Sequence, residues 1–205
     1  NHRNEIDRAL VGFERVGDRW GQSSVLASRG NLRAMDGDIA GGIADYERAL
    51  VLACELGSAQ DEAMVRVRMA ALLMRAGELA RASAMIDDVR ELMPPRTGGF
   101  DRELFVSGME AMVKLLAGDL AGAADLAARL RADREHRVRE LREGHAMAVV
   151  CGSTAIVAVH IGEIDAAVAD LRVGFPMALT TQDMPVIATV GVAVAWVAAG
   201  QGAPA

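Results

Sequence analysis

The chain has 205 residues, of which 52% are hydrophobic but only 3% aromatic, so alanine, valine, leucine and methionine must form most of its core. A formal charge of −6 argues against direct nucleic-acid binding by this segment, because nonspecific binding to a phosphate backbone requires clustered cations. The two cysteines, Cys54 and Cys151, show no metal-ligand spacing, which indicates a reducing, cytoplasmic compartment without a disulfide framework.

A glycine followed by an acid and an aliphatic residue recurs four times along the chain. The glycines are Gly37, Gly77, Gly118 and Gly162, at intervals of 40, 41 and 44 residues. A nearly constant period of this length is typical of helical repeats, whose units bury their apolar faces by stacking on their neighbours. The sequence therefore predicts an all-α fold, a right-handed solenoid of antiparallel helix pairs, in a single domain over 1–205.

The first complete unit, predicted over 20–57, shows how each helix pair is encoded. Apolar residues at helical spacing precede Gly37, which suits the left-handed conformation that ends many helices. Asp38 then accepts backbone N–H groups at the positive dipole end of the next helix, whose apolar stripe begins at Ile39. The pattern predicts an antiparallel helix hairpin, and Gly118-Asp119 repeats its turn.

Three further hairpins are predicted over 60–94, 101–134 and 138–179. Pro94-Pro95 predicts a firm helix end and a loop over 94–100, because proline disfavours helix in the preceding residue. Phe175-Pro176 and the segment 180–185 predict a connection to a last helix. The segments 1–17 and 184–205 have the pattern of half hairpins, so we expect the natural protein to continue in both directions.

Two uncharged stretches, 146–159 and 184–205, could suggest a membrane. A spanning helix needs about 20 apolar residues. Gly152, Ser153 and Thr154 interrupt the first stretch, and Pro185 and Thr189 interrupt the second. The sequence therefore predicts buried repeat helices and no membrane partner.

The hairpin register resembles the tetratricopeptide repeat over nearly the whole chain. Gly42 departs from the family's usual alanine, the signature tryptophan is missing from the first helices, and the period exceeds the family's 34 residues. The matching positions are Gly30, Gly37-Asp38, Tyr46 and Ala49-Leu50 in the first unit, Ala70, Gly77, Ala82 and Pro94 in the second, Ala111, Gly118-Asp119 and Ala123 in the third, and Ala155, Gly162 and Ala167 in the fourth.

Lengthened repeats with spacers such as 16–21 and 55–57 resemble the C-terminal regions of large actinobacterial transcription regulators. These are the Streptomyces antibiotic regulatory proteins, with their bacterial transcriptional activator domain, and the large ATP-binding regulators of the LuxR type. The resemblance implies a domain that senses a signal or partner while other modules of the parent bind DNA and hydrolyse nucleotide. A phosphate loop is not predicted here, because the single lysine, Lys114, does not fit its glycine-rich motif.

A concave groove lined by the first helix of each unit is the resemblance's main functional implication. Its flexible thioether side chains would suit an amphipathic helix, an apolar peptide or a small inducer. The alternative is that these methionines fill the core, which an apolar helical stripe does more often. The predicted groove residues are Asn31, Met64, Val67, Met74, Phe105 and Met112, with Ser24, Ala27, Ala71 and Leu115 at neighbouring positions.

Asn31 matches one position of the carboxylate clamp found in peptide-binding members of the family. Ala27 and Met64 stand where the clamp needs a cation, so the sequence does not favour that mode.

Six arginines lie between Arg129 and Arg142, interleaved with acids. This pattern predicts a solvated helix face with pairs four residues apart, in preference to a site for an anionic ligand. His136 and Glu140 could share a helix face, but without a third ligand of suitable spacing no metal site is predicted.

The string Asp87-Asp88-Val89-Arg90-Glu91 resembles the magnesium motif of isoprenoid synthases, which are also all-helical. Such enzymes need a pocket rich in aromatic residues, and this chain has only four Phe, two Trp and one Tyr. An outer helix face is the favoured interpretation, and an enzyme of this type remains a distant alternative.

Together these patterns predict a non-catalytic interaction or sensing domain of a transcription regulator, without a cofactor or metal. Its expected partner is a protein or peptide, or else a small-molecule inducer. Self-association through the uncharged last helix, giving a homodimer, is the main alternative, because the end of a repeat array exposes apolar surface.

Overall fold

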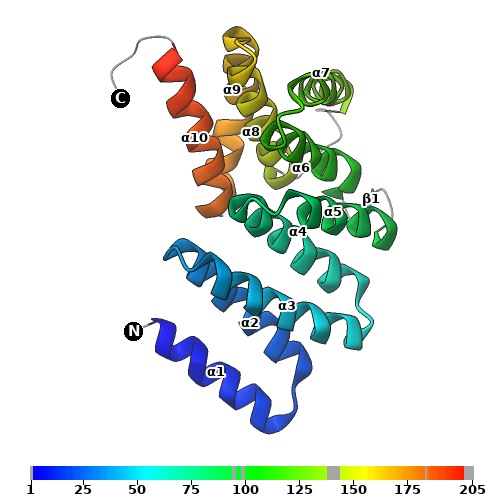
Figure 1. The fold of residues 1–205 in the computed structure, drawn as a ribbon, viewed down its shortest axis with the longest axis vertical. Coiled ribbons are helices and arrows are strands. Elements are labelled where there is room, and N and C mark those ends of the chain that lie inside the picture. The colour runs from blue at the N-terminus through cyan, green and yellow to red at the C-terminus, as the bar shows by residue number, and fades with distance from the viewer. Residues whose placement is uncertain (1, 94–95, 98–99, 138–143, 183, 201–205) are drawn as a thin grey trace. The chain divides into compact units, whose positions relative to one another are not determined.

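The computed structural model describes residues 2–93, 96–97, 100–137, 144–182 and 184–200 (Figure 1). The predicted all-α class is confirmed, since these residues are helical apart from short connections and one pair of two-residue strands. The helices group into two compact units, 1–93 and 94–205. The single domain expected over 1–205 stays a prediction.

Unit 1 consists of five helices in which each helix packs on the next along the chain (Figure 1). Short turns separate them, so successive helices reverse direction. The helices are α1 (His2–Val16), α2 (Arg19–Met35), α3 (Ile39–Leu56), α4 (Ala59–Ala76) and α5 (Leu79–Leu92).

Polar contacts fix the antiparallel register of α2 against α3. They run in order along both helices, with residue numbers rising on α2 as they fall on α3. The pairs are Arg19 with Glu55, Ser23 Oγ with the Ala49 carbonyl at 2.9 Å, Arg29 with Asp45, and Arg33 with the Gly41 carbonyl at 3.2 Å.

The close approach of α2 and α3 depends on two glycines. A Cβ atom on Gly42 would lie 2.9 Å from the Gly30 carbonyl oxygen and 2.8 Å from Leu72 of α4. Glycine at this position therefore has a steric reason, because the helix backbones leave no room for a methyl group. Tyr46 fills the adjacent space and is 2% exposed.

Unit 2 contains β1 (Arg96–Thr97), β2 (Phe100–Asp101), α6 (Arg102–Leu116), α7 (Leu120–Arg137), α8 (Gly144–His160), α9 (Ile164–Thr181) and α10 (Met184–Gly200). Helix α8 is its centre, because α6, α7, α9 and α10 all pack on it. Every residue from Val150 to Ala158 is buried. A helix that is buried on all its faces is a core helix, as the sequence predicts for 146–159.

The recurring glycines lie at the turns inside the helix hairpins with positive φ, between 77° and 89°. These are Gly37, Gly77, Gly118 and Gly162. The acids that follow them differ: the side chains of Asp38 and Asp119 accept the N–H groups of Gly41 and Gly122 at 2.9 Å. Glu78 and Glu163, in the same position, form no side-chain capping bond.

Two local predictions are wrong. Part of the predicted loop over 94–100 forms antiparallel strands, in which Arg96 pairs with Asp101 and Thr97 with Phe100. The predicted connection at Phe175-Pro176 is helical, because α9 continues through Pro176 to Thr181. Proline removes only its own hydrogen bond to the preceding turn, and the packed flanking turns keep the helix continuous.

Among the described residues, none of the helices combines the length and apolarity needed to cross a bilayer.

Candidate binding groove

A cavity of about 280 Å³ opens on unit 1 between α2 and α4. Both helices contribute one face, and the end of α3 closes one side. The lining residues are Trp20, Ser23, Ser24, Ala27 and Ser28 of α2, Leu56 of α3, and Asp61, Met64, Val65 and Arg68 of α4. We call this cavity the α2–α4 groove.

The spacing of the lining residues follows from helix geometry. On α4 the lining positions are i, i+3, i+4 and i+7 from Asp61 to Arg68, which share one face of a helix. On α2 the face runs from Trp20 to Ser28 in the same manner. Two helical stripes facing one another therefore form the groove walls.

Large apolar side chains at the groove are exposed to solvent. Trp20 is 59% exposed, Met64 is 52% exposed and Leu56 is 41% exposed. Between them α2 contributes only small side chains, including Ser24 and Ala27, which leave the space open. Exposed apolar groups around a concavity are typical of binding sites, because covering them removes apolar surface from water.

Two charged side chains line the groove without ion-pair partners. Within the part of the chain that the structure describes, neither the Asp61 carboxylate nor the Arg68 guanidinium pairs with an opposite charge. Arg68 lies beside the Tyr46 hydroxyl: burial raises the pKa of Tyr46, and the nearby guanidinium opposes that rise. The groove therefore offers one carboxylate and one guanidinium group to a ligand.

The predicted groove residues only partly coincide with this cavity. Met64 lines it, together with the neighbouring positions Ser24 and Ala27. Asn31 continues the α2 stripe one turn beyond the lining residues. Val67 and Met74 are not in the lining. At about 100° per residue, Val67 and Met74 lie roughly 110° and 130° around α4 from the middle of the stripe that runs from Asp61 to Arg68.

The predicted groove residues of unit 2 have a different environment. Phe105 is buried, at 7% exposure. Met112 is partly buried and packs against the main apolar cluster of that unit, which contains Ala111 and Ile156. For these two residues the structure agrees with the alternative interpretation as core.

Arg68 is the groove residue that sequence reasoning missed. The resemblance pointed to Ala27 and Met64 as the positions for a cation, and neither residue is charged. A signal was available, because Asp61 and Arg68 flank Met64 and Val65 at helical spacing on one face.

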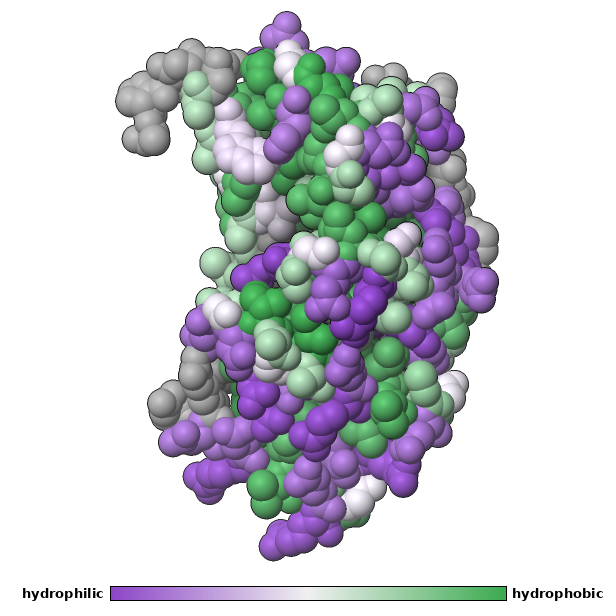
Figure 2. Space-filling view, in the orientation of Figure 1, coloured by the Kyte–Doolittle hydropathy of each residue, from purple (hydrophilic) through white to green (hydrophobic). Residues whose placement is uncertain are grey.

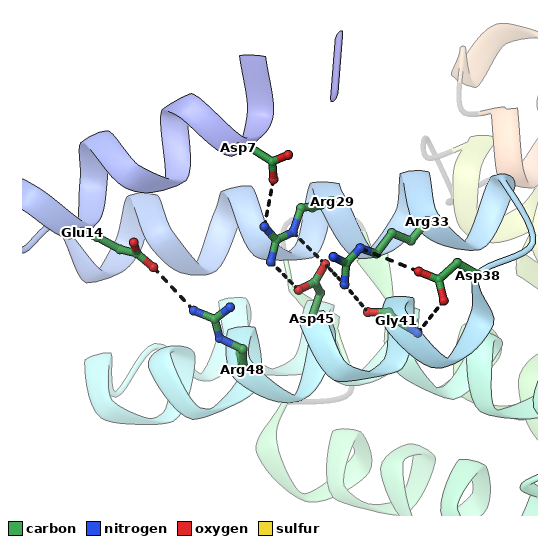
Figure 3. A network of polar contacts seen from close by, with 8 residues as sticks. All are labelled: Asp7, Glu14, Arg29, Arg33, Asp38, Gly41, Asp45 and Arg48. Carbon is green, nitrogen blue, oxygen red and sulfur yellow. Dashed lines mark hydrogen bonds and ion pairs between the residues drawn. The ribbon is translucent and has the colours of Figure 1, made fainter. Parts of the chain in front are cut away.

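A second cavity, of about 150 Å³, lies between α1 and α2 of unit 1 and is lined by Ile6, Asp7, Arg29, Leu32 and Arg33. Its charges are already paired around the buried carboxylate of Asp45 (Figure 3). Arg29 donates to the two Asp45 oxygens at 2.7 and 2.8 Å and to Asp7 at 2.9 Å, and Arg33 lies 3.2 Å from Asp45. Because each cation has a carboxylate partner, this cavity is a structural centre and not a candidate site.

Unit 2 contains a similar centre around Asp170 of α9, which is completely buried. Arg131 and Arg134 of α7 donate to its two oxygens at 2.8 and 2.6 Å. Arg134 also contacts the Cys151 sulfur at 3.2 Å, and burial raises the pKa of that thiol. The predicted solvated face over 129–142 is therefore wrong for these two arginines, although Arg129 does pair with Asp125 four residues earlier.

The other candidates from the sequence have structural partners. Asp87 pairs with Arg90 at 3.2 Å, and Asp88 pairs with Arg66 at 2.8 Å. No group of three or more histidine, cysteine or acidic side chains capable of holding a metal occurs among the described residues. Glu140 and the His136 side chain lie outside them.

No protein-family model matches the chain, and a search of curated proteins also finds no match. Function is therefore inferred from the α2–α4 groove itself.

Proposed function

We propose that the chain is a non-catalytic interaction domain and that the α2–α4 groove binds a segment of a partner protein. The observation that carries the proposal is the combination of exposed Trp20, Met64 and Leu56 around an open cavity. Covering these side chains would remove apolar area from water, at about 25 cal/mol per Å² before the costs of association.

The resemblance to tetratricopeptide repeats and to actinobacterial regulators supports a finer version of the proposal. In this version the helix hairpins belong to a right-handed solenoid, and the parent protein is a cytoplasmic transcription regulator whose other modules bind DNA. Occupation of the groove would then alter how those modules assemble. The regular reversals from α2 to α5 are consistent with such stacking.

Selection of peptides from a random display library on the immobilised protein tests groove binding. Clones should be enriched on the wild type and lost on Met64→Asp, which introduces a charge into the groove. Met35→Asp is the matched control, because Met35 is also exposed, at 61%, and lies on α2 outside the groove lining. Enrichment that is equal on both variants would place binding elsewhere.

A second candidate function, self-association, is favoured by α10 of unit 2. This helix has no charged residue, yet Met184, Val192 and Trp196 are 61%, 44% and 41% exposed. Figure 2 shows apolar patches of this kind on the surface of unit 2. If α10 mediates dimerisation, Val192→Asp should have a smaller sedimentation coefficient than the wild type at high protein concentration. A wild type that is monomeric at every concentration would exclude dimerisation through α10.

A further inference from the structure

We infer that the occupant of the α2–α4 groove is an amphipathic helix that carries one basic and one acidic residue two helical turns apart, on its apolar face. The inference rests on the proposed function and adds the charge pattern of the partner. It follows from three features of the groove: two distinct ends, a fixed spacing between them, and a charge at each end without an ion-pair partner.

Helices α2 and α4 both pack on α3, so contacts with α3 identify the two ends of the groove. At one end Arg19 of α2 pairs with Glu55 of α3, so Trp20 lies near Leu56 and the start of α4, which includes Asp61. At the other end Arg29 pairs with Asp45, next to Tyr46, and Tyr46 lies beside Arg68. The groove therefore has an acidic, aromatic end and a basic end.

Asp61 and Arg68 lie seven positions apart on α4, which corresponds to about 10 Å along the helix axis. A helix that lies alongside α4 repeats its side chains with the same geometry, so its residues i and i+7 face Asp61 and Arg68 together. The apolar residues at i+3 and i+4 of that helix then meet Met64 and Val65. This is the anchor pattern of a helix bound in a groove.

The floor of the groove suits such a helix. Ser24, Ala27 and Ser28 are small, so apolar side chains of an incoming helix can reach the α2 backbone. Met64 is flexible and half exposed, which allows it to adapt to their shape.

Each end selects one sign of charge. Asp61 would pair with the partner's basic residue, and the face of Trp20 at the same end adds an attraction for a cation. Arg68 would pair with the partner's acidic residue, because it forms no ion pair with any carboxylate among the described residues. Like charges at either end are repelled, so the pair determines specificity more than affinity.

A focused peptide library tests the charge pattern. Its members are helices of about 18 residues with a fixed leucine stripe at i+3 and i+4 and with positions i and i+7 randomised. On the wild type, selection should enrich peptides with one basic and one acidic residue, in either order, because a helix can lie in the groove in two directions.

Arg68→Glu should change the selection to peptides with two basic residues, and it should weaken a lysine–glutamate peptide about tenfold or more. Arg15→Glu is the matched control, because Arg15 is an exposed residue of α1 away from the groove. It should leave the selection unchanged.

The possible results separate the two proposals. Enrichment of the leucine stripe without a charge preference, or with one that Arg68→Glu does not alter, would overturn the charge pattern and leave groove binding intact. If no member is enriched on the wild type over Met64→Asp, the groove does not hold a helix, and the inference fails. Enrichment of unrelated non-helical peptides in the random library would still support the proposed function in that case.

Discussion

The two units each bury an aspartate between two arginines, but the arginines come from different places. In unit 1, Asp45 of α3 is held by Arg29 and Arg33 of α2, the other helix of the same hairpin. In unit 2, Asp170 of α9 is held by Arg131 and Arg134 of α7, which belongs to the preceding hairpin. Asp45 therefore closes one hairpin, with Arg29 also reaching Asp7 of α1, whereas Asp170 joins two hairpins.

The side chains of the two centres differ in their exposure to solvent. The side chains of Arg29 and Arg33 are 19% and 39% exposed, so water can reach them if their partner is lost. The Arg134 side chain is 9% exposed and Asp170 is completely buried. A buried cation without a partner is far more costly than one that can be solvated, so the unit 2 centre is the more critical for folding.

Asp170→Ala tests the more buried centre and should have the largest effect. Arg134 would remain buried without a carboxylate, so the free energy of unfolding should fall by roughly 3–5 kcal/mol. Urea denaturation measures the fall, and hydrogen exchange should show faster exchange in α7, α8 and α9 than in α2 and α3.

Asp125→Ala is the matched control on α7 itself. Asp125 and Arg129 form an ion pair in which both side chains are about two-thirds exposed. Such surface pairs contribute about 0–1 kcal/mol, so this variant should unfold almost like the wild type. Equal losses for the two variants would contradict the distinction between buried and exposed aspartates.

Asp45→Ala should have an intermediate effect. It removes two hydrogen bonds from Arg29 and an ion pair from Arg33, and both guanidinium groups can gain water, so we expect a loss of roughly 1.5–3 kcal/mol. In urea denaturation, a loss larger than that of Asp170→Ala would reverse the comparison between the two centres.

Replacing the acids that precede α3 and α5 should lower the free energy of unfolding by less than replacing either buried aspartate. Asp38 accepts the Gly41 N–H, so Asp38→Ala should cost about 1 kcal/mol in thermal or urea unfolding. Glu78 occupies the same place before α5 without a capping bond, and Glu78→Ala should cost less. If Glu78→Ala costs as much as Asp38→Ala, the side-chain bond is not the source of the cap's stability.

The ionisation of Tyr46, the single tyrosine, tests whether Arg68 lies beside its hydroxyl. Burial raises the pKa of Tyr46 above its usual 10.0, and Arg68 opposes that rise. Spectrophotometric titration should therefore find Tyr46 ionising above pH 10 in the folded protein, and at still higher pH in Arg68→Ala. An unchanged midpoint in that variant would show that Arg68 does not lie beside the hydroxyl.

The sign of the associated pH effect follows from the same shift. Below pH 10 both the folded and the unfolded protein keep the tyrosine proton, so its contribution to stability is constant. Above pH 10 the unfolded chain loses that proton first, so stability should fall as the pH rises toward the folded pKa.

The helices were predictable from the sequence because their signals are local. Glycines such as Gly37 and Gly118 adopt the left-handed conformation at the turns, and the aspartates after them cap the next helix. Apolar spacing within about 18 residues then gives each helix its buried face. Pro176 misled the prediction because tertiary packing keeps α9 helical there.

The polar centres were not predictable because their partners are distant in the sequence. Arg131 meets Asp170 39 residues later, and an arginine among acids has the same local pattern whether it faces water or a buried carboxylate. Likewise, the apolar stripe of α6 does not reveal that Phe105 is buried whereas Met64 of α4 is exposed. Which face is covered depends on neighbouring helices.

The most direct test of groove binding is a methyl NMR titration of the protein with a selected lysine–glutamate helix. The account predicts that the Met64 methyl signal shifts on binding, whereas Met109 and Met147, both buried in unit 2, keep their positions. Shifts of Met109 or Met147 while Met64 stays unchanged would contradict it and would place the binding site in unit 2.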